Sequence, residues 1–101
     1  MDTLHIDARK EDYRQWMIGQ LQLWDSDIVL LKAAVERLEP DVRPKATGRL
    51  WEVERRHHQV FGKYGDLMLA DDAQWDEKQI ALDAAAERVQ ELLDGFTLQH
   101  A

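Results

Sequence analysis

The sequence is poor in several residue types that often decide what a protein does. Its 101 residues include no cysteine, two prolines and five glycines, and Ser26 is the only serine. Without cysteine there is no disulfide bond, no thiolate metal ligand and no cysteine nucleophile. Uninterrupted apolar runs are no longer than that from Ile28 to Leu31, which is too short for a secretion signal or a membrane-spanning helix. We therefore expect a cytoplasmic protein.

The motifs of common catalytic sites are missing as well. The sequence contains no glycine-rich phosphate-binding loop, no Gly-x-Ser-x-Gly turn and no His-Glu-x-x-His zinc motif. A nucleophile, a general base and oxyanion donors are not recognisable as a set. We expect the protein not to be an enzyme and to need no cofactor.

Acidic residues outnumber basic ones, and the two kinds are unevenly distributed. The net charge of −7 disfavours binding to nucleic acid or to anionic membranes, because both depend on many Lys and Arg side chains. The net charge is −4 for residues 1–42, +4 for residues 43–65 and −7 for residues 66–101. We expect these segments to lie side by side, with charged pairs along their edges. The alternative is a basic stripe offered to an acidic partner, formed by Arg49, Arg55, Arg56 and Lys63.

Three series of mainly apolar residues repeat with alternating spacings of three and four, which is the heptad pattern of packed α-helices. The pattern predicts a single all-α domain over residues 1–101, with these three seams as its core. The first seam consists of Met17, Leu21, Trp24, Ile28, Leu31, Val35 and Leu38. The second consists of Leu50, Val53, His57, Val60, Tyr64 and Leu67. The third consists of Trp75, Gln79, Leu82, Ala86, Val89, Leu93 and Phe96.

The expected helices cover about 10–39, 42–70 and 72–94, after a loose N-terminal lead-in of residues 1–9. Pro40 disfavours helical geometry in the residue before it and so ends the first helix. Pro44 falls within the first turn of the second helix, where a missing N–H costs nothing.

Four further residues are expected to mark helix ends. Asp7 and Asp41 are candidate N-caps of the first and second helices. Asp71 with Gln74 has the spacing of a capping box at the start of the third helix. Gly95 is expected to close that helix in the C′ position.

The pattern leaves the path of the second half of the chain open. The first two helices can pack antiparallel in a register in which the numbers of two facing residues add up to about 81. This register places Trp24 opposite His57. Residues beyond about 76 then need another surface to bury their apolar face. A turn near residues 70–72 gives an antiparallel three-helix bundle, whereas a long continuous second helix gives a two-helix hairpin that must dimerise. We expect the bundle, because its helices have similar lengths.

One short stretch resembles a metal site. Glu54 and His57 are three residues apart, as ligands are in di-iron carboxylate bundles, and Glu54 and His58 share one helical face. Asp25 or Asp27 of the first helix would lie opposite and supply a further ligand. The alternative is that His57 is a polar seam position, hydrogen-bonded to one of these two carboxylates, that fixes the register.

The four tryptophans are numerous for this length. Trp24 and Trp75 lie on seams and Trp51 lies on a second face of its helix, so we expect all three to pack in the core. Trp16 is off the main seam. Three large apolar residues spaced by seven form an outer line on the first helix, where we expect a partner or the third helix to dock. This outer line consists of Trp16, Leu23 and Leu30.

The order of several seam residues resembles a known family. The residues are Tyr13, Met17, Gln20, Leu21, Trp24, Ile28 and Leu31, followed by Leu50, Leu67, Ala70, Asp72 and Trp75. They are similar to those of small bacterial coiled-coil proteins of about one hundred residues described as stress-response proteins. The resemblance implies a cytoplasmic helical protein without known catalysis and linked to stress physiology, and it carries over no functional residues.

These observations lead to two hypotheses of function. The first is a non-enzymatic helical interaction module that binds itself or another helical protein, as a monomeric bundle or a homodimer. The second is a metal-binding helical bundle that uses Glu54, His57 and His58 with Asp25 or Asp27. Nucleic acid and membranes are not expected as partners.

Overall fold

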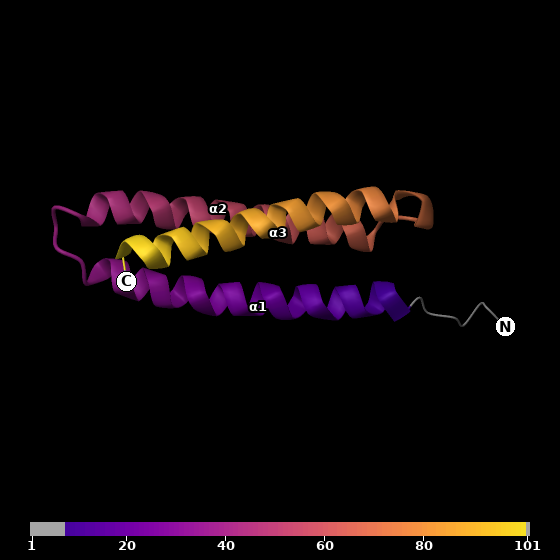
Figure 1. Ribbon diagram of the computed structural model, residues 1–101, viewed down its shortest axis with the longest axis horizontal. Coiled ribbons are helices and arrows are strands. Elements are labelled where there is room, and N and C mark those ends of the chain that lie inside the picture. Colours follow the sequence, from indigo (N-terminus) through magenta and orange to yellow (C-terminus); the bar gives the residue numbers. More distant parts are fainter. Residues whose placement is uncertain (1–7, 101) are drawn as a thin grey trace.

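Three long α-helices, each antiparallel to the one before it, make up the fold (Figure 1). The computed structural model describes residues 8–100, with side chains up to residue 96. Helix α1 spans Ala8–Glu36, α2 spans Arg43–Met68 and α3 spans Asp72–His100. The predicted all-α three-helix bundle is confirmed. The alternative with one long second helix is wrong, because the chain turns back between α2 and α3.

The core follows the three predicted seams. Each helix turns by about 100° per residue, so residues spaced by three and four stay on one face and can be buried together. Five residues of the first seam, four of the second and six of the third are buried. The remaining apolar seam residues, Leu31, Leu38 and Tyr64, are partly buried against them. No polar side chain is fully buried among residues 8–96.

The turn between α1 and α2 differs from expectation at two residues. Helix α1 ends at Glu36 and not at residue 39. The N–H groups of Arg37 and Leu38 instead donate to carbonyls three residues earlier, which tightens the chain before Pro40. Asp41 was predicted to cap α2, and this is wrong. The N-cap position is occupied by Val42, whose side chain makes no capping hydrogen bond.

The predicted start of α3 is confirmed, whereas its predicted end is wrong. Asp71 Oδ1 accepts a hydrogen bond from the N–H of Gln74 at 2.9 Å. Helix α3 continues through Gly95 to His100. Gly95 does not have the positive φ of a C′ glycine. Because Phe96 is a buried seam residue, burial of its ring favours continuing the helix past the glycine. The candidate cap Asp7 lies outside the described residues.

Replacing Asp71 by alanine is expected to lower the free energy of unfolding by about 1 kcal/mol, because it removes the side-chain acceptor of the Gln74 N–H and leaves only the longer bond to the Asp71 carbonyl oxygen. Asp41→Ala is the matched control and is expected to have a smaller effect, since Asp41 makes no capping bond. Urea unfolding followed by circular dichroism measures both. Equal losses in the two variants would contradict the assignment of the cap.

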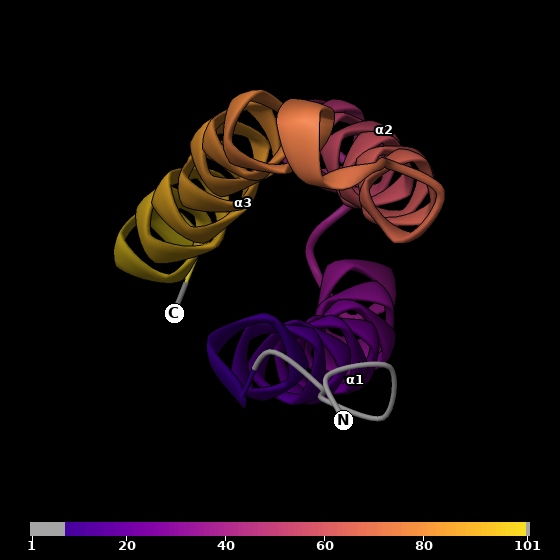
Figure 2. The ribbon, with the colours of Figure 1, turned by 90° about the vertical axis from the view of Figure 1, so that its right-hand side faces the viewer.

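Helix α2 lies between α1 and α3 in the packing. It packs against both neighbours, whereas no Cα of α1 lies within 8 Å of a Cα of α3 in the described residues. Figure 2 shows α1 standing apart from α3 when the bundle is viewed along its length. The rings of Trp24 and His57 lie 6.4 Å apart between centroids, which confirms the predicted register of α1 with α2. The bundle measures 63 × 19 × 18 Å.

Candidate interaction surface

The outer line lies on α1 and faces solvent. Trp16 is 53% exposed, Leu23 is 60% exposed and Leu30 is 69% exposed. Seven residues complete nearly two helical turns, so these three side chains run in one row along the helix. Helix α3 does not cover them, although the sequence left that possibility open. The row is therefore an apolar surface without a partner inside the described residues.

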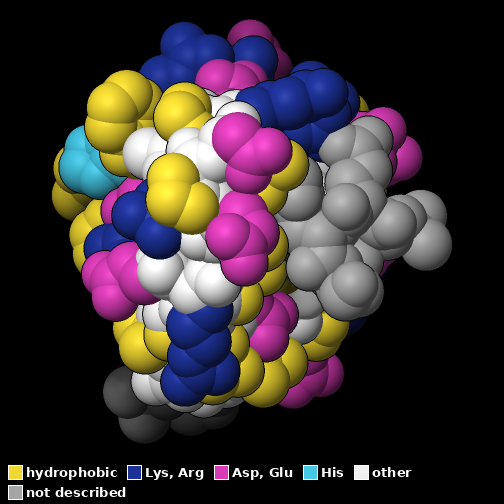
Figure 3. Space-filling model, turned by 90° about the vertical axis from the view of Figure 1, so that its left-hand side faces the viewer, with side chains coloured by type: hydrophobic (Ala, Val, Ile, Leu, Met, Phe, Trp, Pro, Cys, Tyr) yellow, Lys and Arg dark blue, Asp and Glu magenta, His cyan; other side chains and the backbone are white. Residues whose placement is uncertain are grey.

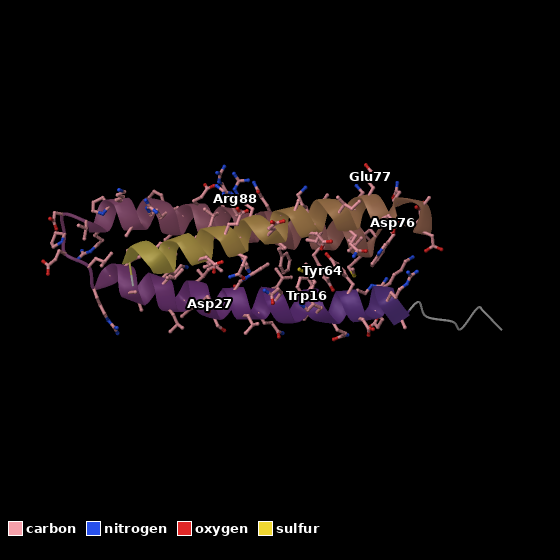
Figure 4. All side chains as sticks on the ribbon, in the orientation of Figure 1. Trp16, Asp27, Tyr64, Asp76, Glu77 and Arg88 are labelled. Carbon is pink, nitrogen blue, oxygen red and sulfur yellow. The ribbon has the colours of Figure 1, made fainter. Side chains whose placement is uncertain are left out.

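The ring of Trp16 contacts one neighbouring aromatic ring on its own helix, that of Tyr13. Its ring lies 5.9 Å from that of Tyr13, and Tyr13 in turn meets Trp75 of α3 edge to face at 6.5 Å. Figure 4 shows Trp16 on α1, in the same part of the bundle as Tyr64 of α2. Aromatic anchors with few rotatable bonds lose little entropy on binding, so Trp16 is suited to contact a partner.

Two cationic side chains of α1 contact the ring of Trp75. Lys10 Nζ lies 5.0 Å from the centre of the Trp75 ring and Arg14 Cζ lies 5.3 Å from it, both within the range of cation–π attraction. Lys10 also pairs with Asp72 at 2.6 Å, which links the starts of α1 and α3. These contacts surround an open hollow of about 530 Å³ between the two helices. Its lining consists of Arg9, Lys10, Asp12, Tyr13, Trp16, Trp75, Asp76 and Gln79.

Tyr13 provides a second link between α1 and α3. Its phenol donates a hydrogen bond to Asp83 Oδ1. Partial burial raises the pKa of Tyr13 well above its ordinary value, and the hydrogen bond to Asp83 raises this pKa further. The neutral phenol is therefore the form that the fold stabilises.

This shifted pKa predicts a loss of stability in alkaline solution. The unfolded chain releases the Tyr13 proton at its ordinary pKa of 10.0, whereas the folded chain retains it at higher pH. The contribution of Tyr13 is therefore complete below pH 10.0 and falls as the pH rises further. Urea unfolding at a series of pH values should show a steeper alkaline decline for the wild type than for Tyr13→Phe. Parallel declines would contradict the assignment.

Leu30 lies beside a second, smaller hollow between α1 and α3, with a volume of about 270 Å³. Leu30, Leu31 and Asp27 line it from α1, and Gln90, Leu93 and Asp94 line it from α3. Trp24 Nε1 donates a hydrogen bond to Gln90 Oε1 at 3.2 Å nearby. The outer line therefore borders both hollows along the boundary of α1 with α3.

The candidate metal ligands are only partly brought together. Glu54 Oε2 pairs with Lys32 Nζ at 3.1 Å, and His58 is exposed. His57 Nε2 lies 3.4 Å from the carbonyl oxygen of Leu21 and 3.9 Å from Asp25 Oδ1. This placement of His57 agrees with a polar seam position beside Asp25.

Asp27 lies elsewhere, on the side of α1 that borders α3 (Figure 4). Asp25 and not Asp27 is thus the carboxylate near His57, because the two residues differ by about 200° in direction around the helix. No group of three or more His, Asp or Glu side chains in the described part of the chain is arranged to hold a metal ion. The metal site stays a prediction.

The basic segment on α2 does not pair with the acidic third helix as expected. Arg55 and Arg56 both bind Glu52 of their own helix. Lys32 with Glu54 joins α1 to α2, but no ion pair joins α2 to α3 among residues 8–96. The expected charged pairs thus join α1 to α2 and α1 to α3, whereas none is found between α2 and α3 in this part of the chain. The helices α2 and α3 are held by apolar packing instead.

A second apolar area was missed by the sequence analysis. Trp51 was expected in the core but is 68% exposed, and Phe61 on the same helix is also exposed. Trp51 borders a shallow hollow at the α1–α2 turn. Figure 3 views the molecule from this end and shows hydrophobic side chains at the surface beside charged ones. The signal was present in the sequence as a second heptad face on α2, but its exposure depends on where α3 packs. The hollow is lined by Pro40, Arg43, Pro44, Thr47, Gly48 and Trp51.

Comparisons with known proteins add no family to this description. The chain matches no protein-family model, and it has no significant match among curated proteins or solved structures. The resemblance to stress-response coiled-coil proteins stays a prediction. A search of the described residues for a helix that is long and apolar enough to cross a membrane finds none.

Proposed function

We propose that the protein is a non-enzymatic interaction module that binds an α-helix on the outer face of α1. The observation that carries this proposal is the exposure of the outer line, in which three large apolar side chains lie in one row on a single helix. Exposed apolar rows of this kind, rimmed by polar residues, are typical of protein-binding surfaces. A helix can bury such a row by placing its own side chains between them.

The core supports the same proposal, because it is complete without the outer line. The buried residues of α1 all belong to the first seam, and none belongs to the outer line. A change in the outer line should therefore alter binding while leaving the bundle folded. The alternative of a metal-binding bundle has no comparable support, since Glu54 is paired with Lys32 and Asp27 lies near α3.

Site-specific photo-crosslinking in cells that naturally produce the protein tests this proposal. A photo-reactive amino acid at Ser26, which is exposed beside Leu23 and Leu30, should give discrete protein adducts. The same amino acid at Lys63, which is exposed on α2, is the matched control and should give none of these adducts. Adding Leu23→Glu and Leu30→Glu to the Ser26 probe should remove the adducts while circular dichroism shows unchanged helicity. The absence of adducts at Ser26, or equal adducts at Lys63, would overturn the proposal.

A further inference from the structure

The outer face of α1 carries a complete second heptad pattern. Each residue of the outer line is followed three positions later by a small residue, and together the six residues alternate by three and four. Ser26 and Ala33 are exposed, and apart from the adjoining residues and the backbone of α1 itself, no atom lies within 4 Å of the place where a side chain would begin at Gly19. The helix therefore presents alternating large and small positions to solvent. The small line consists of Gly19, Ser26 and Ala33.

This pattern is complementary to itself when two copies of α1 run antiparallel. The two seam positions of a heptad are called a and d. When two helices pair antiparallel, each a position of one helix faces a d position of the other. Trp16 then faces Ala33 of the second copy, Leu23 faces Ser26 and Leu30 faces Gly19. Every large side chain meets a small one, so the helices can approach closely and fill the space between them. A two-fold axis repeats each of these layers twice.

The charges at the ends of the row fit the same register. The next layer outward places Asp12 of one copy opposite Arg37 of the other. Both side chains are exposed, and neither has an ion-pair partner in its own chain among the described residues. A parallel arrangement would instead bring Asp12 onto Asp12 and Arg37 onto Arg37, and would crowd Trp16 against Trp16. Both volume and charge thus select the antiparallel pair.

We infer that the partner of the outer face of α1 is a second copy of this chain, bound antiparallel with Leu23 against Ser26. This inference rests on the proposed function and names the occupant of the same surface. The resulting homodimer joins two complete three-helix bundles through α1. It differs from the long-helix dimer considered from the sequence, because no helix here depends on its partner to fold.

Sedimentation equilibrium of the purified full chain tests the fit at the small positions. The wild type is expected to dimerise. Gly19→Leu should weaken the dimer by about tenfold or more, because the added side chain occupies the space of Leu30 from the second copy. Gly62→Leu is the matched control, since its new Cβ also meets no atom within 4 Å apart from its own helix backbone and adjoining residues, but it lies on α2. It should leave the dimerisation constant unchanged, and equal weakening in the two variants would overturn the register.

A charge-reversal cycle tests the ends of the row. Asp12→Arg and Arg37→Asp should each weaken the dimer roughly tenfold, because each turns two attractive pairs into repulsive ones. The double variant should return to the wild-type constant. Asp66→Arg on α2 is the control and should have little effect. Failure of the double variant to recover would overturn the pairing of Asp12 with Arg37.

Cysteine pairing gives the orientation, because the chain has no cysteine of its own. An oxidised mixture of Leu23→Cys and Ser26→Cys should form the mixed disulfide in preference to either symmetric one, and the reverse preference would overturn the antiparallel arrangement.

A wild type that stays monomeric at all concentrations would overturn the inference of a homodimer. In that case, photo-crosslinks from Ser26 to a different protein would still support the proposed function. The absence of any photo-crosslink at Ser26 would overturn both the inference and the proposed function.

Discussion

Replacing Leu82 by alanine is expected to lower the free energy of unfolding by about 2–5 kcal/mol. Leu82 is fully buried in the third seam, near the middle of α3. Its removal loses the apolar contacts of three carbon atoms and leaves a cavity that rigid neighbouring helices fill only in part. Small domains have a total stability of about 5–15 kcal/mol, so this single change removes a large fraction of it.

Ile80→Ala is the matched control on the same helix. Ile80 is 69% exposed, although it is only two residues from Leu82. Truncating it removes little buried surface and introduces a better helix former, so the change in stability should stay within about 0.5 kcal/mol. Urea unfolding followed by circular dichroism compares the two variants. Similar losses at both positions would mean that the face of α3 assigned to the core is wrong.

The cores of α1 and α3 could be predicted because each follows from the local periodicity of apolar residues. Leu82 and Val89 are seven residues apart on α3, and both are fully buried. The same rule placed Leu23 and Leu30 outside, since they belong to a different row of α1. These cores and the outer line therefore follow from the spacing of apolar residues before any contact between helices is known.

The errors arise where a feature depends on how the helices are arranged. Trp51 belongs to a second apolar face of α2, and only the position of α3 decides which face is covered. Gly95 was expected to end α3, but burial of Phe96 next to it favours a longer helix. Whether Asp25 or Asp27 lies near His57 depends on the rotation of α1 about its axis. None of these can be read from one helix alone.

Replacing Trp24 by alanine is expected to cost about 3–5 kcal/mol, because Trp24 holds α1 to both other helices. Its buried ring meets that of His57 on α2, and its Nε1 donates to Gln90 on α3. The loss should fall first on α1, since no Cα of this helix lies within 8 Å of α3 in the described residues. Amide hydrogen exchange should therefore show weaker protection of α1 than of α2 and α3 in Trp24→Ala.

Trp51→Ala provides the control with the same change of side chain at an exposed position. Its cost should be below about 1 kcal/mol, because most of the Trp51 surface already contacts water. Equilibrium unfolding of the two variants separates burial from residue type. If Trp51→Ala were as costly as Trp24→Ala, the hollow beside Trp51 would have to be a covered part of the core, and the boundary between core and surface on α2 would be misplaced.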